Sequence, residues 1–242
     1  MAFISNMEMD YIALKLVEKF EGGRHQDCFD IDGFVRDLLG LRVEYRNICE
    51  KKGEVIGTLC NGSTSLRIKE DDVIKEVVFP KWTIVLDSVL RSPCNSGRRR
   101  FTLAHEASHY ILDSLDRRET RYYTCEESFT DRDCENFFSS ANFIEAQANR
   151  LASLLLVPEL TMLDLLDREL KGKRIDLYGD TVILPEEKEA LNRIANDLGV
   201  SYTMLFWRLM NFTRERGNRI FNKKGADELI EKVIAKDAGK TV

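Results

Sequence analysis

The chain has few of the features that mark membrane proteins and secreted proteins. No apolar run approaches the roughly 18 residues that cross a bilayer, so we expect no membrane-spanning helix. The opening segment MAFISNMEMDYIALKL has no basic stretch followed by a clean hydrophobic core, so we expect no signal peptide. The 6 cysteines form no C-x-x-C pair, and without a secretory signal we interpret them as free thiols of a reducing compartment. These absences predict a cytoplasmic protein.

A strong positive charge is also absent. The formal net charge of -5 argues against a chain that binds nucleic acid by bulk charge alone. One C-terminal stretch is nevertheless basic, and only Glu215 opposes its Arg208, Arg214, Arg216, Arg219, Lys223 and Lys224. A solvated helix end is the simpler interpretation of this stretch, and contact with a phosphate backbone or an acidic partner is the alternative.

Histidine is scarce, since the chain has only 3, and two of them lie in one short motif. His105-Glu106-Ala107-Ser108-His109 sits inside FTLAHEASHYIL, which we expect to form a buried helix. Positions i and i+4 share one helix face, so both imidazoles can bind one Zn²⁺, with Glu106 beside them as the general base. The alternative is a pair of ordinary half-buried histidines. The apolar flanks favour the metal site, because they make unliganded imidazoles costly.

A catalytic zinc site needs a third protein ligand and an open fourth position. The segment 142–158 predicts a strong helix, with Asn142 as its N-cap and Pro158 after its end. Glu145 lies on a stripe of this helix that is otherwise small and apolar except for Asn149, so we predict Glu145 as the third ligand. The alternative is a first-turn glutamate stabilised by the helix dipole. Asn149 follows one turn later and can orient a ligand histidine by a hydrogen bond.

The rest of the chain alternates helical and β-like patterns. Apolar spacing predicts helices at 8–20, from Asp30 or Asp32 to residue 39, and at 159–170, whereas short β-like runs occur at 41–45, 53–60, 64–69, 73–79 and 83–87. Residues 113–140 show no clean period and are either a lid or a loop, in which Tyr122 and Tyr123 are candidate oxyanion donors. We place a catalytic core at residues 1–170 and a C-terminal helical extension at residues 171–242.

Two further helices are expected in the C-terminal extension. Pro185 begins the first, Gly199 ends it and Ser201 caps the second. A helix, a short turn and a helix also describe a DNA-reading helix-turn-helix. The second helix is very apolar for a free recognition helix, since it holds Met204, Leu205, Trp207 and Leu209. We therefore expect it to pack on the catalytic core.

The segments RRRFTLAHEASHYIL and EAQANRLASLLLVP together resemble the ImmA/IrrE-type metallopeptidases. The C-terminal LNRIANDLGVSYTMLFWRLMNF is similar to the tail of that family, and the resemblance spans about residues 10–215. The resemblance maps the metal ligands to His105, His109 and Glu145, and the catalytic glutamate to Glu106. Ser108 stands where the family usually has glycine, and the stretch between His109 and Glu145 is longer than usual.

The resemblance implies an α+β, zincin-like fold, mostly helical, with a small mixed or antiparallel sheet beside the HExxH helix. It places the strand before that helix, residues 83–87, at the border of the cleft, as an edge strand with which an extended peptide can pair. It also implies a zinc-dependent intracellular endopeptidase that cleaves a helix-turn-helix repressor or an antitoxin-like partner at a specific site. Mn²⁺ or Fe²⁺ can occupy the same ligands, because metal choice reflects availability as well as geometry.

Two rival functions remain open at this point. One is a metal-stabilised module that binds a repressor without cleaving it, against which Glu106 argues. The other is a DNA-binding regulator that acts through residues 189–224, although we expect no strong binding to nucleic acid. Neither rival involves a membrane.

Overall fold

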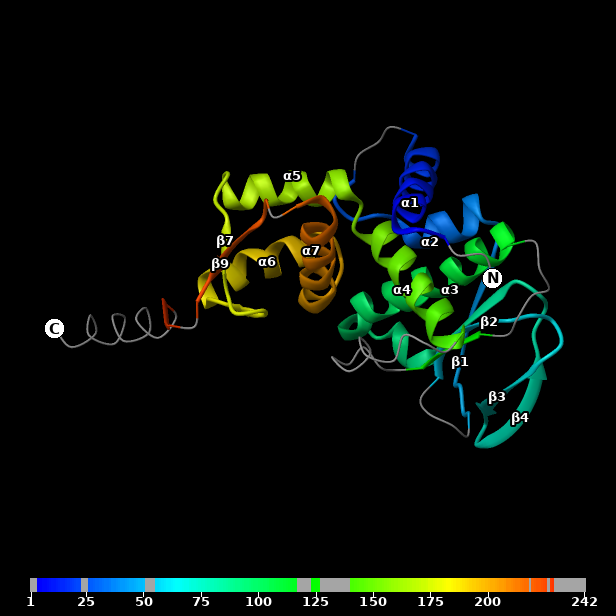
Figure 1. Ribbon diagram of the computed structural model, residues 1–242. Helices are drawn as coiled ribbons and strands as arrows, with labels where there is room; N and C mark the ends of the chain where they lie inside the picture. The colour runs from blue at the N-terminus through cyan, green and yellow to red at the C-terminus, as the bar shows by residue number, and fades with distance from the viewer. Residues whose placement is uncertain are drawn as a thin grey trace. The chain divides into compact units, whose positions relative to one another are not determined.

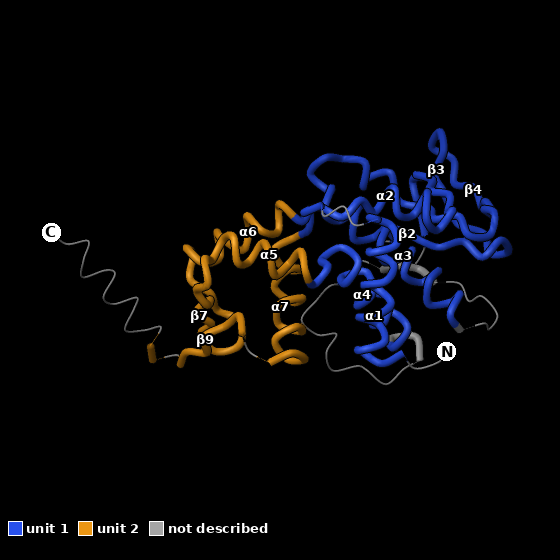
Figure 2. The backbone as a smooth tube through the Cα atoms, turned by 90° about the horizontal axis from the view of Figure 1, so that it is seen from above, with its two compact units in different colours: residues 1–159, 198–200 blue, residues 160–197, 201–242 orange. Residues whose placement is uncertain are grey.

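The computed structural model describes residues 4–22, 26–50, 55–116, 123–126, 140–217, 219–225 and 227–228. The chain forms two compact units, one of residues 1–159 with 198–200 and one of residues 160–197 with 201–242 (Figures 1 and 2). The boundary drawn from the sequence at residue 170 lies at the end of helix α5 (Glu159–Leu170), whereas the units divide at the start of that helix. None of the described helices is long and apolar enough to cross a membrane.

The first unit begins with helix α1 (Asn6–Glu21), whose two ends are fixed by local signals. The Ser5 side chain accepts a hydrogen bond from the Glu8 backbone N–H, and the Glu8 carboxylate accepts one from the Ser5 N–H in return, which forms a capping box. Gly22 ends the helix in the left-handed conformation that glycine adopts without strain. Helix α2 (Ile31–Gly33) follows with Asp30 as its N-cap and continues as a π-helical turn over Phe34–Leu38.

A four-stranded sheet in the order β1-β5-β2-β6 forms the β layer of this unit. It consists of β1 (Arg42–Arg46), β2 (Val55–Leu59), β5 (Thr83–Asp87) and β6 (Tyr123–Glu126). Strands β1 and β5 are parallel, and β2 is antiparallel to both β5 and β6. All five residues of β2 are buried, as are the first four of β5, because both strands lie in the interior of the sheet.

A separate hairpin of β3 (Ser65–Glu70) and β4 (Val73–Val78) adds a second, smaller core. Its buried side chains pack with those next to the main sheet, and the cluster comprises Cys60, Leu66, Ile68, Phe79 and Val85. Two 3-10 turns, Ser88–Arg91 and Pro93–Asn95, then connect β5 to the long helix α3 (Ser96–Asp116).

Two expectations drawn from the sequence are wrong in this region. The strand 83–87 does not border the cleft as an edge strand, because β5 lies between β1 and β2. Its short run of β-branched and apolar residues predicts a strand, but this run carries no information on which neighbours the strand pairs with. The interpretation of 113–140 as a lid or a loop missed strand β6, whose four residues pair with β2. Tyr122, the side chain of Tyr123 and most of this segment lie outside the described residues.

Helix α4 (Ser140–Leu156) packs against α3 and α1. It begins before the expected Asn142, so that residue lies within its first turn and is not the N-cap. Small residues make the packing close, since Ala104, Ala107, Ala148 and Ala152 are all completely buried. Two contacts tie α4 to the N-terminal segment: Gln147 donates to the carbonyl of Ile4 at 3.1 Å, and Arg150 pairs with Asp10 at 2.9 Å.

The N-terminal half of α3 is held by two neighbouring arginines. Arg99 donates two hydrogen bonds to the Asp32 carboxylate, at 2.6 and 2.7 Å. Arg100 donates to the carbonyl oxygen of Phe29 at 2.7 Å and to that of Gly199 at 3.1 Å. Since bidentate pairs and charged hydrogen bonds fix orientation, these contacts set the direction in which α3 carries its motif.

The second unit has its own small sheet and helices. Strand β7 (Ile175–Tyr178) lies between β8 (Val182–Ile183), which is antiparallel to it, and β9 (Phe221–Lys224), which is parallel. Helix α5 precedes the sheet, and helices α6 (Pro185–Asp197) and α7 (Tyr202–Arg216) pack against each other. Pro185 and Ser201 begin these two helices, as the sequence predicts.

Candidate metal centre

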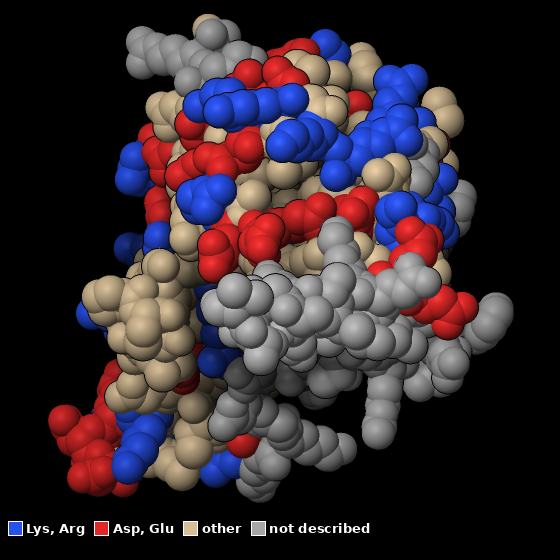
Figure 3. Space-filling model, turned by 90° about the vertical axis from the view of Figure 1, so that its left-hand side faces the viewer, with Lys and Arg blue, Asp and Glu red and all other residues tan. Residues whose placement is uncertain are grey.

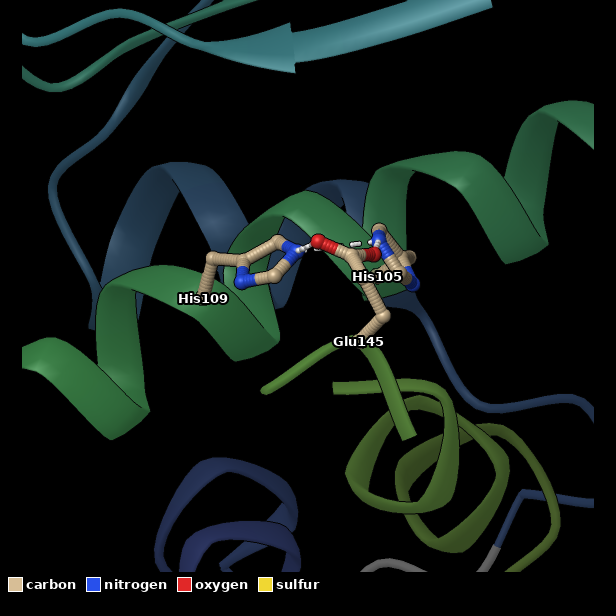
Figure 4. A group of neighbouring side chains, drawn as sticks. All are labelled: His105, His109 and Glu145. Atoms are coloured by element: carbon tan, nitrogen blue, oxygen red, sulfur yellow. Dashed lines mark hydrogen bonds and ion pairs between the residues drawn. The ribbon is translucent and has the colours of Figure 1, made fainter. Parts of the chain in front are cut away.

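Helix α3 presents both histidines of the motif on one face, and α4 presents Glu145 opposite them (Figure 4). The Nε2 atoms of His105 and His109 lie 3.0 Å apart. The Glu145 carboxylate lies 3.1 Å from Nε2 of His105 and 3.4 Å from Nε2 of His109. The structure therefore brings together the three residues that the sequence analysis predicted as ligands. Glu145 follows His105 by 40 residues and His109 by 36 residues in the sequence.

The three donor groups fit one metal ion. Ligands about 2.0–2.1 Å from a common tetrahedral centre lie roughly 3.3 Å from one another, which is close to the observed separations. The two Nε2 atoms also face each other in a buried site, and two lone pairs at that distance repel unless a cation or a proton lies between them. Two imidazole nitrogens and one carboxylate are moreover a donor set of catalytic zinc sites. Among the described residues these three form the group of His, Cys, Asp and Glu side chains close enough to share an ion.

Asn149 lies one turn beyond Glu145 on α4 and contacts the back of His105. Its Oδ1 atom is 2.8 Å from Nδ1 of His105. With a carbonyl oxygen as the acceptor, Nδ1 carries the hydrogen and Nε2 keeps its lone pair for the site. The structure thus places Asn149 where the sequence analysis expected a residue that orients a ligand histidine.

Burial separates the roles of the side chains. His105, Glu106 and His109 are almost completely inaccessible, at 1%, 0% and 1% exposure. The Glu145 side chain is 34% exposed and is therefore the most accessible of the three candidate ligands.

Hydrogen bonds to the histidines control the charge of Glu145. Burial alone would raise its pKa, but the contacts with His105 and His109 outweigh burial and hold the pKa at about 2. Burial opposes the charge on His105 as well, yet Glu145 and Glu106 leave the pKa of that histidine raised. For His109 burial dominates, and its pKa is lowered. The site therefore keeps a carboxylate anion next to imidazoles, which suits a cation.

Glu106 lies beside the two histidines on α3, and its carboxylate is close to strand β2. Its carboxylate oxygens have no hydrogen bond of good geometry among the described residues, although the Leu59 backbone slightly lowers its pKa. Burial raises that pKa to about 8, His105 partly offsets the effect, and the Glu145 charge adds to it. An uncommitted buried carboxyl that shares its environment with the three ligands is suited to exchanging a proton.

Sequence reasoning missed Gly57, which lies on β2 directly against this carboxyl. A Cβ atom at residue 57 would overlap Thr102 Cγ2 and would lie 3.4 Å from Glu106 Oε1. Glycine is therefore what lets β2 approach α3 closely. The available signal was an isolated glycine inside a strand pattern, which often marks a close approach of the backbone.

Comparison with known proteins identifies a family for this chain. The family model described as the IrrE N-terminal-like domain, a peptidase family, matches residues 82–210. The chain belongs to this family. The match begins just before β5 and ends within α7, so it includes both helices that carry the candidate ligands. It confirms the resemblance stated from the sequence, and the fold is the expected α+β, zincin-like fold with small mixed and antiparallel sheets.

The remaining comparisons add little beyond the family. A Mycobacterium tuberculosis transcriptional regulator of known structure aligns with a TM-score of 0.45 and 13% sequence identity, over 87% of this chain and 48% of that one. The chain thus spans about half the length of that regulator. No curated protein matches the chain. The matched family is a family of peptidases, and the candidate triad fits a metal cofactor.

Proposed function

We propose that this chain is a zinc-dependent endopeptidase. The observation that carries the proposal is the convergence of His105, His109 and Glu145 within 3.0–3.4 Å of one another, with the buried Glu106 carboxyl one residue from the first ligand. A zinc ion held by these three side chains would supply a Lewis acid for the scissile carbonyl and would make a nearby water molecule more acidic.

The residues of the chain then account for the movement of the proton. Glu106 takes a proton from the water whose oxygen attacks the scissile carbonyl carbon. As the C–N bond breaks, Glu106 passes that proton to the leaving amine and returns to its carboxylate form. Asn149 holds His105 in the tautomer that leaves the Nε2 lone pair available to the metal. Gly57 has no side chain, so strand β2 leaves space for the Glu106 carboxyl.

The proposed substrate is a helix-turn-helix repressor or an antitoxin-like protein, cleaved at one site. Membership of the IrrE-like peptidase family supports a protein substrate, and the repressor is what the resemblance to the ImmA/IrrE-type metallopeptidases implies. The free thiols of Cys28, Cys49, Cys60 and Cys94 favour the cytoplasm as the place of action. Mn²⁺ or Fe²⁺ are the alternative metals, since their preferences overlap at nitrogen and carboxylate ligands.

We also propose that residues 171–242 act as an extension of the peptidase core and do not read DNA. The side chains of α7 support this, because Leu205, Phe206, Arg208, Leu209 and Phe212 are buried and leave few groups for base contacts. Figure 3 shows a face on which Lys and Arg side chains gather above a band of Asp and Glu side chains, so that face lacks a uniform positive field.

The decisive experiment compares the wild type with Glu106→Gln. The substitution keeps the size of the side chain and removes its base, so cleavage should fall by roughly 10²–10⁴-fold. Zinc content and thermal unfolding should change little, because Glu106 is not among the three ligands. Both proteins are incubated with a repressor encoded beside the gene, and the repressor is followed by mass spectrometry.

The outcomes separate the proposal from its rival. Loss of cleavage with retained zinc and retained binding of the repressor supports the endopeptidase. Equal cleavage by both proteins contradicts the role of Glu106. If neither protein cleaves and both bind the repressor, the chain is a binding module that sequesters its partner.

A further inference from the structure

Trp82 has a backbone conformation that bulky residues rarely adopt. Its φ angle is 65°, in the left-handed region, where the Cβ of an L-residue crowds the chain. A side chain of this size is disfavoured there, so the surrounding structure must hold it in place. Trp82 directly precedes strand β5, and forming that strand does not require a left-handed residue at this position. The strain therefore suggests a functional role for the Trp82 side chain.

Backbone hydrogen bonds on both sides hold this turn. The Trp82 N–H donates to the carbonyl of Cys60 at 2.9 Å, and the Thr83 N–H donates to the carbonyl of Pro80 at 3.2 Å. The Lys81 ammonium lies 4.5 Å from the centroid of the Trp82 ring. The turn therefore fixes the direction of the indole rather than leaving it free in solvent.

The indole packs edge-to-face against Tyr110 of α3. The two ring centroids are 5.0 Å apart and the rings are 83° from parallel. Both residues are only partly buried. Trp82 and Tyr110 thus form a partly exposed aromatic pair, which we call the aromatic shelf.

The aromatic shelf lies one helical turn beyond Glu106. Tyr110 follows His109 directly and is four residues after Glu106 on the same helix, a rise of about 6 Å. The Cys60 carbonyl that holds Trp82 directly follows Leu59, the β2 residue whose backbone acts on Glu106. Both neighbours of Glu106 therefore connect it to the aromatic shelf: α3 through Tyr110, and the end of β2 through the hydrogen bond between Cys60 and Trp82.

From this placement we propose that the aromatic shelf is a specificity subsite that receives a large apolar side chain of the substrate, such as Phe or Leu. The inference rests on the proposed endopeptidase function. An extended peptide advances about 3.4 Å per residue, so a rise of about 6 Å corresponds to a side chain about two residues from the scissile bond. Two ring surfaces at a fixed angle bind an apolar or aromatic side chain better than a small or charged one.

Cleavage preferences provide the first test. A mixture of peptides from a tryptic digest of an unrelated proteome is incubated with zinc-loaded protein, and the new ends are sequenced by mass spectrometry. We expect enrichment of Phe, Leu, Tyr or Met at one position about two residues from the cut. The enrichment should disappear in Trp82→Gly and in Tyr110→Ala. Trp82→Gly also relieves the backbone strain, so loss of folding would not explain its effect.

Inhibitor binding provides a second test that does not need cleavage. Two series of peptide hydroxamates place the chelating group at either end of the peptide, and each compares an all-glycine peptide with one that holds a single Phe. In a Trp207→Phe background, Trp82 is the one remaining tryptophan of the 2, so its emission reports the shelf. We expect one Phe peptide to bind roughly tenfold more tightly than its glycine counterpart and to change the Trp82 emission.

The control variant is Tyr11→Ala, which removes a 62% exposed aromatic side chain on α1 and should leave both preferences unchanged. A Phe preference that survives in both Trp82→Gly and Tyr110→Ala overturns the subsite, as does cleavage with no apolar preference. If the wild type cuts no peptide but retains a Phe preference that depends on Trp82, the subsite stands and the endopeptidase function fails.

Discussion

Nδ1 of His105 lies 2.8 Å from Oδ1 of Asn149, so the side chain that orients this histidine comes from the same helix as Glu145. The two α4 residues are one turn apart and act on the two nitrogens of one imidazole ring. A shift of α4 along α3 would disturb both contacts at once. The geometry of the centre therefore depends on the close packing of the two helices, which their buried alanines allow.

Removing the ligands should remove the metal. We expect about one equivalent of zinc per wild-type chain, and its loss in His105→Ala and in Glu145→Ala, because each leaves only two protein ligands. Glu18→Ala serves as the matched control, since Glu18 is an exposed glutamate paired with Lys15 on α1. Elemental analysis of purified proteins gives the content, and full zinc in both ligand variants would refute the assignment.

Asn149→Ala should weaken zinc binding without abolishing it. The variant leaves Nδ1 of His105 without its acceptor, and loss of such a supporting bond typically lowers metal affinity by about 10–100-fold. Asn149→Asp keeps an acceptor oxygen at the same place and should bind zinc nearly as well as the wild type. Competition with a chelator measures the affinities, and Asn47→Ala, at an exposed position, is the control. Equal affinities for Asn149→Ala and the wild type would exclude an orienting role.

The sequence predicted those parts of the metal centre that depend on residues close together in the chain, and it missed those that depend on contacts between distant segments. The spacing of His105 and His109 is a property of one helix, so it predicted their common face directly. Glu145 and Asn149 were identified from a second helix whose small residues indicated close packing. Gly57 and the Trp82–Tyr110 pair were missed, because their roles arise from contacts between segments distant in the sequence.

The strands show the same limit. The runs at 64–69, 73–79 and 83–87 were recognised within one residue at each end, since alternation and turn residues are local. Their partners were not, and β5 proved to be interior where an edge strand was expected. Strand β6 gave no pattern, because a four-residue strand is shorter than the window in which alternation stands out.

The Arg99–Asp32 pair should make stability depend on pH in the acid range. The hydrogen bond from Arg99 outweighs burial and holds the pKa of Asp32 below its ordinary value of 3.8. A depressed folded-state pKa stabilises the protein fully above the unfolded-state pKa, and this stabilisation is lost as the pH falls through the folded-state pKa. Asp32→Asn should therefore unfold more easily at pH 7, by about 1–2 kcal/mol after allowance for its partial exposure.

The difference between Asp32→Asn and the wild type should be constant above about pH 5 and shrink as the pH falls below the ordinary pKa of aspartate. Urea unfolding at a series of pH values measures it. Asp37→Asn is the control, because Asp37 pairs with Arg36 on an exposed surface where solvent screens the charges. A difference that grew toward acid pH would contradict the sign of the pKa shift.

Duplex DNA should bind only weakly and in a salt-sensitive manner. The exposed basic residues at the end of α7, Arg214 and Arg216, can contact phosphates, but the buried middle of the helix offers little to base edges. Affinity should therefore fall steeply with added salt and vary little with sequence. Fluorescence anisotropy over a salt series measures this. A sequence-specific complex that persists at physiological salt would instead favour a DNA-binding regulator.

Gly57→Ala should destabilise the protein through one identifiable contact. The new methyl group would overlap Thr102 Cγ2 and press on Leu86 and Glu106, and such overpacking typically costs about 1–3 kcal/mol. Thr102→Ser removes Cγ2 and keeps the hydroxyl that donates to the Arg98 carbonyl at 3.0 Å. The double variant should therefore recover most of the lost stability, and with it the peptidase activity that depends on the position of Glu106.

The matched control for this experiment is Gly225→Ala, because a Cβ at residue 225 meets no atom within 4 Å and its backbone is not left-handed. Urea unfolding of the two single variants, the Thr102→Ser variant and the double variant forms a complete cycle, and the coupling between residues 57 and 102 should be favourable by a large part of the Gly57→Ala cost. Additive effects would show that the methyl group acts elsewhere, and that the close approach of β2 to α3 does not depend on the absence of a side chain at residue 57.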